Sequence, residues 1–224
     1  STAYYSAING HDVTVFERQP HAGGMMRYGI PEYRLPKATL DKEIDVMKRL
    51  GVKIQTGKAL GQQIRLEDLA KDFDAVFLAI GSWRATPLQI EGENLPGVWL
   101  GIQYLEAQTK GVKIDLGAHV VVIGGGNTAI DCARVALRKG AGKVTLLYRR
   151  TQEEMPAEPY EVEEALHEGV EMRFLMAPNS IVMEDGMKKL HCAEMRLGEP
   201  DRSGRRRPVP VEGSDIVIEA DTII

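Results

Sequence analysis

The sequence predicts an α/β fold made of two halves of the same helix–strand type, with a small antiparallel meander toward the C-terminal end. Three observations predict it: apolar runs of strand length that lead into helices, an internal repeat, and strand-like segments separated by turn signals near the end. The repeat aligns VTVFER at residues 13–18 with VTLLYR at residues 144–149, an offset of 144 − 13 = 131 positions. A helix of small residues that ends at a glycine precedes each copy, so both halves carry the same helix–strand unit.

The first half is expected to alternate helices with short strands. Residues 1–10 have the character of a helix end, and residues 12–16 form a buried strand. The spacing of Leu40, Ile44 and Met47 predicts an amphipathic helix over 40–50. The other expected elements are a strand at 52–55, a helix at 66–70 and a central parallel strand at 74–80 (DAVFLAI).

The second half begins after a connection rich in proline and glycine between residues 86 and 97. The expected elements are a helix at 98–110, a strand at 119–123, a helix at 127–139, a strand at 143–147 and an acidic helix at 158–168. The glutamates of the acidic helix are expected on its solvent face. From residue 170 onward the pattern predicts a meander, with turns at 184–186, 201–204 and 213.

Composition limits the classes of function. The net charge of −4 gives no electrostatic case for nucleic acid, and the basic cluster of Arg202 and residues 205–207 is interpreted as a solvated hairpin loop. No apolar run approaches the roughly 20 residues of a membrane span. Cys132 and Cys192 form no CxxC or metal-ligand spacing, so we expect no metal site and a reducing, cytoplasmic setting.

The motif VVVIGGGNTAIDCA at residues 120–133 carries the clearest chemical signal. An apolar strand runs into a helix through Gly124, Gly125 and Gly126, which allow a tight turn and close approach of a pyrophosphate to the helix N-terminus. Ala129, at the third glycine position, keeps helix and strand close. A glycine-rich turn without a ligand is the alternative.

The end of the next strand indicates which nucleotide binds. An acid there favours NAD, whereas arginine accommodates the 2′-phosphate of NADP. Here Tyr148 is followed by Arg149 and Arg150, so we expect NADP(H), although two solvated arginines would give the same pattern. The first copy keeps an acid, Glu17, which suits an adenosine ribose without a 2′-phosphate, as in FAD; by itself Glu17 would be read as a surface residue.

The segment HAGGMMRYGIPEYRLPK at residues 21–37 follows Glu17 directly. Its glycines permit close backbone approach, its methionines can pack on a flat ring, and Arg27 and Arg34 can face phosphate or flavin oxygens. A long surface loop is the alternative, and composition does not choose between them.

Five stretches make the chain resemble a known family. They are GGMMRYGIPEYRLPK, AIGSW (79–83), VVIGGGNTAIDCAR, YRRTQEEMPA (148–157) and the closing EADTII. Together they resemble the FAD- and NADPH-binding part of the glutamate synthase small (β) subunit family, along essentially the whole chain. The resemblance implies a flavoprotein with two Rossmann-like domains, in which NADPH reduces FAD and electrons pass to an iron–sulfur partner subunit or domain.

The resemblance also implies domain limits and residue roles. It predicts a partial FAD-binding domain at 1–94, a complete NADP(H)-binding domain at 95–214, and a strand at 215–224 that returns toward the FAD domain. The roles, matched motif by motif, are Glu17 for the FAD ribose; Gly24, Met25, Arg27 and Pro31 along the flavin; Gly81 at the exit from the FAD sheet; Gly124, Gly125, Gly126, Asn127 and Thr128 for the pyrophosphate; Asp131 near the nicotinamide; and Arg149 and Arg150 for the 2′-phosphate. For Asp131, a place on the helix surface is the alternative. No catalytic side chain is expected, because the cofactors supply the chemistry.

The sequence departs from the family pattern in three places. The glycine loop expected before Ser1, the cluster-binding cysteines that precede it, and the strand that covers the flavin after EADTII have no counterpart, so an internal fragment is expected. Two other functions stay open: an NADP(H)-binding module without activity of its own, and a thioredoxin-reductase-like enzyme. The second is disfavoured, since no cysteine pair is placed to relay electrons.

Overall fold

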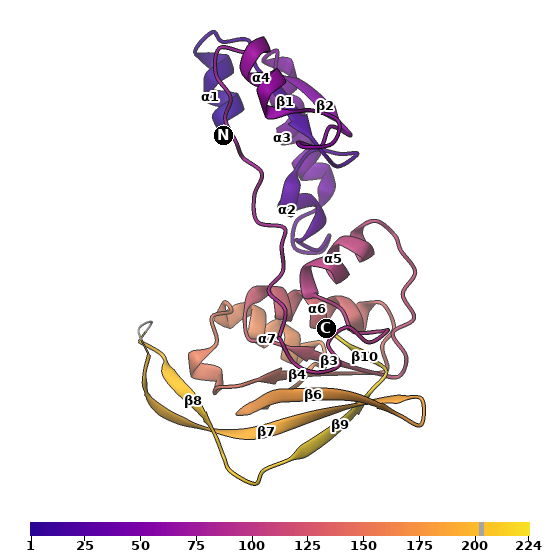
Figure 1. Ribbon diagram of the computed structural model, residues 1–224. Coiled ribbons are helices and arrows are strands. Elements are labelled where there is room, and N and C mark those ends of the chain that lie inside the picture. Colours follow the sequence, from indigo (N-terminus) through magenta and orange to yellow (C-terminus); the bar gives the residue numbers. More distant parts are fainter. Residues whose placement is uncertain (202–203) are drawn as a thin grey trace. The chain divides into compact units, whose positions relative to one another are not determined.

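The computed structural model describes residues 1–201 and 204–224 (Figure 1). The chain divides into two compact units, Ser1–Trp83 and Arg84–Ile224. Each unit contains one copy of the internal repeat. The domain limits at 94/95 and 214/215 and the return of residues 215–224 toward an FAD domain stay predictions.

The first unit contains a two-stranded parallel sheet and four helices. The strands are β1 (Thr14–Glu17) and β2 (Lys53–Thr56), and Glu17 lies opposite Thr56. The helices are α1 (Thr2–Ile8), α2 (Gly24–Tyr28), α3 (Lys37–Arg49) and α4 (Leu66–Asp72). Helix α3 buries Leu40 and Ile44, two of the residues whose spacing predicted it. The expected helices and short strands of this half are confirmed, apart from one.

The predicted central strand at 74–80 is wrong. This run has no regular secondary structure and pairs with neither strand of the first unit's sheet. Its side chains are open to solvent, with Phe77 and Ile80 each 69% exposed. A buried parallel strand depends on ladder partners and on elements that cover its faces. The described residues of this unit provide neither, so the apolar sequence alone does not produce a strand.

The second unit is built on a four-stranded parallel sheet. Its order is β10 (Thr222–Ile223), β3 (His119–Ile123), β4 (Lys143–Tyr148) and β5 (Glu171–Phe174). Helices α5 (Gly101–Thr109), α6 (Asn127–Arg138) and α7 (Pro159–His167) lie on one side of it (Figure 1). The expected strands and helices of this half are confirmed, with ends that differ by a few residues.

The meander is confirmed from β6 to β9, but the first and last strands expected in it, β5 and β10, belong to the parallel sheet. Strand β5 pairs in parallel with β4, because α7 crosses between them and returns the chain in the same direction. The antiparallel strands are β6 (Met176–Glu184), β7 (Met187–Pro200), β8 (Arg206–Pro210) and β9 (Ile216–Ala220), and β7 pairs with the other three. The hairpin between β6 and β7 turns at Asp185 and Gly186, both with positive φ.

The two sheets of the second unit share one apolar core. Val121 and Leu147 of the parallel sheet pack in a cluster with Ile181, Leu190 and Ile218 of the antiparallel strands. Figure 1 shows the antiparallel strands on the side of the parallel sheet away from α6. This packing leaves the carboxyl ends of β3 and β4 side by side, which is where the glycine motif begins.

The acidic helix differs from expectation. Glu161, Glu164 and Glu168 of α7 do not simply face solvent, because each pairs with Arg134 of α6, at 2.7, 3.4 and 2.7 Å. Arg134 is 5% exposed. Periodicity places the glutamates on one helix face but does not show that a cation of another helix lies against it.

In the described part of the chain, no helix combines the length and hydrophobicity that a membrane crossing requires. The same residues contain no group of three or more His, Cys, Asp or Glu arranged to hold a metal ion. The predicted loop of the basic cluster falls partly on residues 202 and 203, which lie outside the described residues. Arg206 and Arg207 are placed in β8.

Candidate functional site: a nucleotide site at the ends of β3 and β4

The glycine turn joins β3 directly to α6. Gly124 has φ +145, a region that side chains disfavour, and its N–H donates to the carbonyl of Leu147 at 2.9 Å. A Cβ atom at Gly124 would lie 3.0 Å from the Cβ of Ala129. The small residue at 129 therefore lets strand and helix approach closely, as the motif predicts.

Gly125 has no room for a side chain. A Cβ atom there would lie 2.5 Å from two ring atoms of Tyr148, the last residue of β4. The ring is fixed, because it is buried and its hydroxyl donates to the carbonyl of Glu154 at 2.8 Å. The glycine at 125 is therefore required by the tyrosine at the end of the next strand.

The N-terminus of α6 is open to an anion. Gly126 is the N-cap and supplies no side-chain acceptor, and the first N–H groups of a helix have no acceptor within the helix. These groups and the helix dipole favour a negatively charged ligand. Thr128 is exposed, whereas the side-chain oxygen of Asn127 accepts from the N–H of Glu158 at 3.0 Å and so ties α6 to the start of α7.

The two arginines after β4 have different surroundings. The Arg149 side chain is exposed and makes no hydrogen bond or ion pair with any residue that the structure describes. Arg150 is 4% exposed. Its Nη2 donates to Asp201 at 2.8 Å and its Nε to the carbonyl of Arg206 at 2.7 Å. The sequence pattern predicts the same role for both arginines. In the structure the Arg149 side chain is exposed, whereas the Arg150 side chain is buried and bonded within the protein.

A capped turn follows the arginines. Thr151 and Glu154 form a capping box around a short 3₁₀ helix, η1 (Gln152–Glu154). The Thr151 hydroxyl and the Arg206 guanidinium, whose Nε donates to Glu154 at 2.6 Å, hold the pKa of the Glu154 carboxyl below its usual range. The sequence patterns assigned no role to Glu154 and placed Arg206 in a solvated hairpin loop, whereas Arg206 begins β8. The T-x-x-E spacing reveals the first, but no sequence signal reveals that β8 brings the second to this turn.

Asp131 is buried in α6, at 4% exposed, rather than on the helix surface. Its neighbour Cys132 is fully buried, and burial, with the Asp131 charge beside it, raises the pKa of this thiol. A role for Asp131 near the nicotinamide stays a prediction.

The residues assigned to FAD lie in the first unit. Glu17 ends β1, and its carboxylate accepts from the N–H of Gln19 at 2.8 Å. Arg27 donates to the carbonyl of Ala22 at 2.6 Å and pairs with Asp41, so its guanidinium braces the turn before α2.

The other predicted FAD residues shape the backbone of the same unit. Gly24 begins α2 with φ +54, and Met25 packs against Gly29, where a Cβ atom would lie 2.3 Å from the Met25 Cε. Pro31 is buried and its carbonyl accepts from the N–H of Leu35 at 3.0 Å. Gly81 has φ +68. Compact, glycine-dependent backbone is compatible with close approach of a ligand, and the roles themselves stay predictions.

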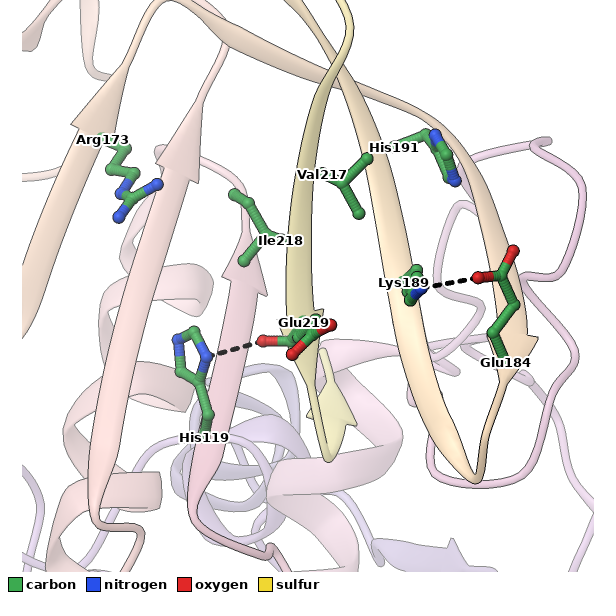
Figure 2. Close-up of a pocket in the computed structure, with 8 residues that line it drawn as sticks. All are labelled: His119, Arg173, Glu184, Lys189, His191, Val217, Ile218 and Glu219. Atoms are coloured by element: carbon green, nitrogen blue, oxygen red, sulfur yellow. Dashed lines mark hydrogen bonds and ion pairs between the residues drawn. The ribbon is translucent and has the colours of Figure 1, made fainter.

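An open cavity of about 620 Å³ lies elsewhere in the second unit (Figure 2). Its charged lining is His119, Arg173, Glu184, Lys189, His191 and Glu219. His119 is the first residue of β3, so the cavity lies at the opposite end of that strand from Gly124.

Several of the side chains that line this cavity already have partners within the protein. Lys189 contacts Glu184 at 2.6 Å, and His119 Nδ1 donates to the carbonyl of Glu219 at 2.7 Å (Figure 2). The Nε2 atom of His119 then accepts from the Thr145 hydroxyl at 2.9 Å, and burial lowers the pKa of this imidazole. We therefore assign the candidate nucleotide site to the glycine turn and not to this cavity.

The fold and the glycine turn define a dinucleotide-binding α/β protein. The sequence matches the pyridine nucleotide-disulphide oxidoreductase family over residues 1–224. The chain belongs to this family.

Two curated relatives are similar along nearly the whole chain. The NADPH-Fe(3+) oxidoreductase subunit beta of Geobacter sulfurreducens is 46% identical over 99% of this chain and 34% of its own length. The glutamate synthase [NADPH] small chain of Halomonas elongata is 38% identical over 96% of this chain and 48% of its own length. The chain thus spans between a third and a half of these relatives.

Among solved structures, FprA of Mycobacterium tuberculosis, determined in complex with NADPH, has the same fold. The TM-score is 0.83 at 19% identity, and the match covers 99% of this chain and 66% of FprA. These findings confirm the predicted fold class and the predicted family relationship.

Proposed function

We propose that this chain is the FAD- and NADP(H)-binding part of an oxidoreductase that takes electrons from NADPH. The observation that carries the proposal is the turn of Gly124, Gly125 and Gly126 between β3 and α6, with the exposed Arg149 at the end of the adjacent strand. In this arrangement the turn and the helix N-terminus bind the pyrophosphate, and arginine after β4 binds the 2′-phosphate. Relatives whose names specify NADPH support this choice of nucleotide.

FAD is the proposed second cofactor, held in part by the first unit. Glu17 at the end of β1 offers a carboxylate for the adenosine ribose, and the tight backbone around Gly24 permits close approach of the flavin. When both cofactors are bound, NADPH supplies a hydride and FAD accepts it. The contribution of this chain is to bind and orient them.

The electron acceptor is proposed to be an iron–sulfur domain or partner subunit. The two relatives are by name a beta subunit and a small chain, so both function with other subunits. Disulfide chemistry is disfavoured. Cys132 and Cys192 are both free and buried, and burial raises the pKa of Cys192 to about 11, so neither thiol is readily ionised.

Parallel titration of the chain with NADPH and NADH tests the nucleotide assignment. The unmodified chain is expected to bind NADPH at least about tenfold more tightly than NADH. Arg149→Gln should remove about tenfold of the NADPH affinity and leave NADH unchanged, because only NADPH carries the 2′-phosphate. Arg196→Gln, the same charge change at an exposed position of β7, is the control. Equal affinity of the unmodified chain for both nucleotides contradicts the assignment.

Colour separates the oxidoreductase from a binding module without activity. If the chain retains FAD, the purified protein is yellow and loses its visible absorbance when NADPH is added without oxygen. A colourless preparation that still binds NADPH supports the binding module. The measurement is an absorbance spectrum before and after anaerobic addition of NADPH, with an excess of added FAD in a second sample. Absence of bleaching in a yellow sample contradicts hydride transfer from NADPH.

A further inference from the structure

The carboxyl end of β4 gathers three arginines whose guanidinium groups are not equally available. Two follow β4 in sequence, and the third, Arg206, begins β8. Arg149 is exposed and unpaired among the described residues, whereas Arg150 is almost fully buried. A phosphate dianion needs guanidinium N–H groups that are both accessible and correctly oriented.

Arg150 is already bonded within the protein. Its Nη2 donates to Asp201 at 2.8 Å, and its Nε donates to the main-chain carbonyl of Arg206 at 2.7 Å. With a side chain only 4% exposed and its charge opposed by a carboxylate, it has little capacity for a second anion. The bond from Arg150 to the Arg206 carbonyl therefore fixes the backbone where β8 begins.

Arg206 has the accessibility that Arg150 lacks. Its Nε donates to Glu154 at 2.6 Å, and its Nη2 lies 3.5 Å from Glu153, which is itself 85% exposed. The other Glu154 oxygen is bonded to Thr151, so this carboxylate is held in one orientation. Glu154 thus takes one edge of the guanidinium, while the Arg206 side chain remains 46% exposed. A guanidinium has five N–H donors, and most of those of Arg206 have no partner among the described residues.

We propose that Arg149 and Arg206, rather than Arg149 and Arg150, bind the 2′-phosphate of NADP(H). Glu154 orients Arg206, and Arg150 is a positioning residue that acts through the Arg206 backbone. The inference rests on the proposed function, because it concerns the same nucleotide site. It assigns part of the nucleotide preference to β8, which lies 56 residues after Arg150 in the sequence.

The test uses two ligands that differ only in the 2′-phosphate, adenosine 2′,5′-bisphosphate and 5′-AMP, titrated by calorimetry into the full chain. Arg206→Gln is expected to weaken the bisphosphate about tenfold and to leave 5′-AMP unchanged. Arg207→Gln, the same charge change at the next and also exposed residue, should change neither affinity. Arg206→Lys should restore only part of the loss, because lysine keeps the charge but not the planar fork.

A double-mutant cycle separates the positioning role from direct contact. If Arg150 acts through Arg206, then Arg150→Gln lowers the ratio of bisphosphate to 5′-AMP affinity in the unmodified background and has no further effect on it once Arg206 is glutamine. Additive losses would show that Arg150 contacts the phosphate itself and would overturn its positioning role. Should Arg150→Gln fail to fold, the comparison of the Arg206 and Arg207 variants still decides whether Arg206 binds the phosphate.

The outcomes distinguish the two proposals. If the unmodified chain binds both ligands equally, the NADP(H) assignment fails, and with it this inference. If it prefers the bisphosphate and Arg206→Gln retains that preference in full, only the assignment of Arg206 is overturned.

Discussion

Gly125→Ala is expected to destabilise the second unit by roughly 1–3 kcal/mol and to weaken NADPH binding at least about tenfold. The added methyl group would lie 2.5 Å from the Tyr148 ring, which is buried and whose hydroxyl donates to the carbonyl of Glu154. Neither the ring nor the turn moves without disturbing the other, so the backbone of the glycine turn, where we propose that the pyrophosphate binds, shifts. Denaturant unfolding and NADPH titration measure the two effects.

The adjacent glycine supplies the matched control. A Cβ atom at Gly126 would lie 3.9 Å from its nearest neighbour, the Cγ of Pro156, and the φ of this residue is −96. Gly126→Ala is therefore expected to fold normally and to change stability by less than about 0.5 kcal/mol. If the two alanine variants lose the same amount of stability in denaturant unfolding, the steric explanation is wrong. A Tyr148→Ala background offers a second check, since the cost of alanine at 125 should shrink once the ring is removed.

Arg134→Met is expected to reduce the free energy of unfolding by about 3–5 kcal/mol. Arg134 belongs to α6, and its guanidinium donates to Glu161 and Glu168 at 2.7 Å each. Without this cation, Glu161 loses the ion pair at 2.7 Å and Glu168 keeps Arg138 as its cationic partner, so the negative charge at the contact between the two helices is compensated less well. Denaturant unfolding at neutral pH measures the loss. Arg138→Met removes a second partner of Glu168 whose side chain is 47% exposed, so it should cost about 1 kcal/mol or less.

The pH dependence of the free energy of unfolding gives an independent test of the ion pairs between Arg134 and the glutamates 161 and 168. Hydrogen bonds from Arg138 and Arg134 lower the pKa of Glu168 from 4.5 to about 2. A carboxyl whose pKa is lower in the folded state stabilises the protein fully above its unfolded pKa, and this contribution is lost as the pH falls toward the folded value. The difference in stability between the unmodified chain and Arg134→Met should therefore narrow between pH 5 and pH 2. A constant difference across that range would mean that Glu168 does not carry the effect.

The sequence predicted the elements of the second unit closely because their signals are local. Strand β3, the glycine turn and α6 follow from an apolar run, three glycines and helical periodicity within twenty residues. The repeat at an offset of 131 residues placed the corresponding strand of the first unit, and β1 lies where the repeat predicts it.

The predictions that failed depended on neighbours distant in the sequence. The run at 74–80 has the composition of a central strand, but the strand requires a partner that the described first unit does not provide. The segment at 171–174 was expected in a meander, and its pairing with β4 depended on the path of α7. The glutamates of α7 have the pattern of a solvent face, yet Arg134 of another helix lies against them.

The sequence by itself determined the fold class, the glycine turn and the presence of arginine after β4, because turn geometry and hydrophobic periodicity act over a few residues. Only the tertiary structure decided which of these arginine side chains is exposed and which is bonded within the protein. Arg149 and Arg150 are indistinguishable as sequence neighbours, but Asp201 and the backbone of Arg206 engage one and leave the other exposed. Whether an arginine side chain is exposed depends on what the rest of the chain packs against it. For Arg150 the partner is the start of β8, which lies more than fifty residues later in the sequence.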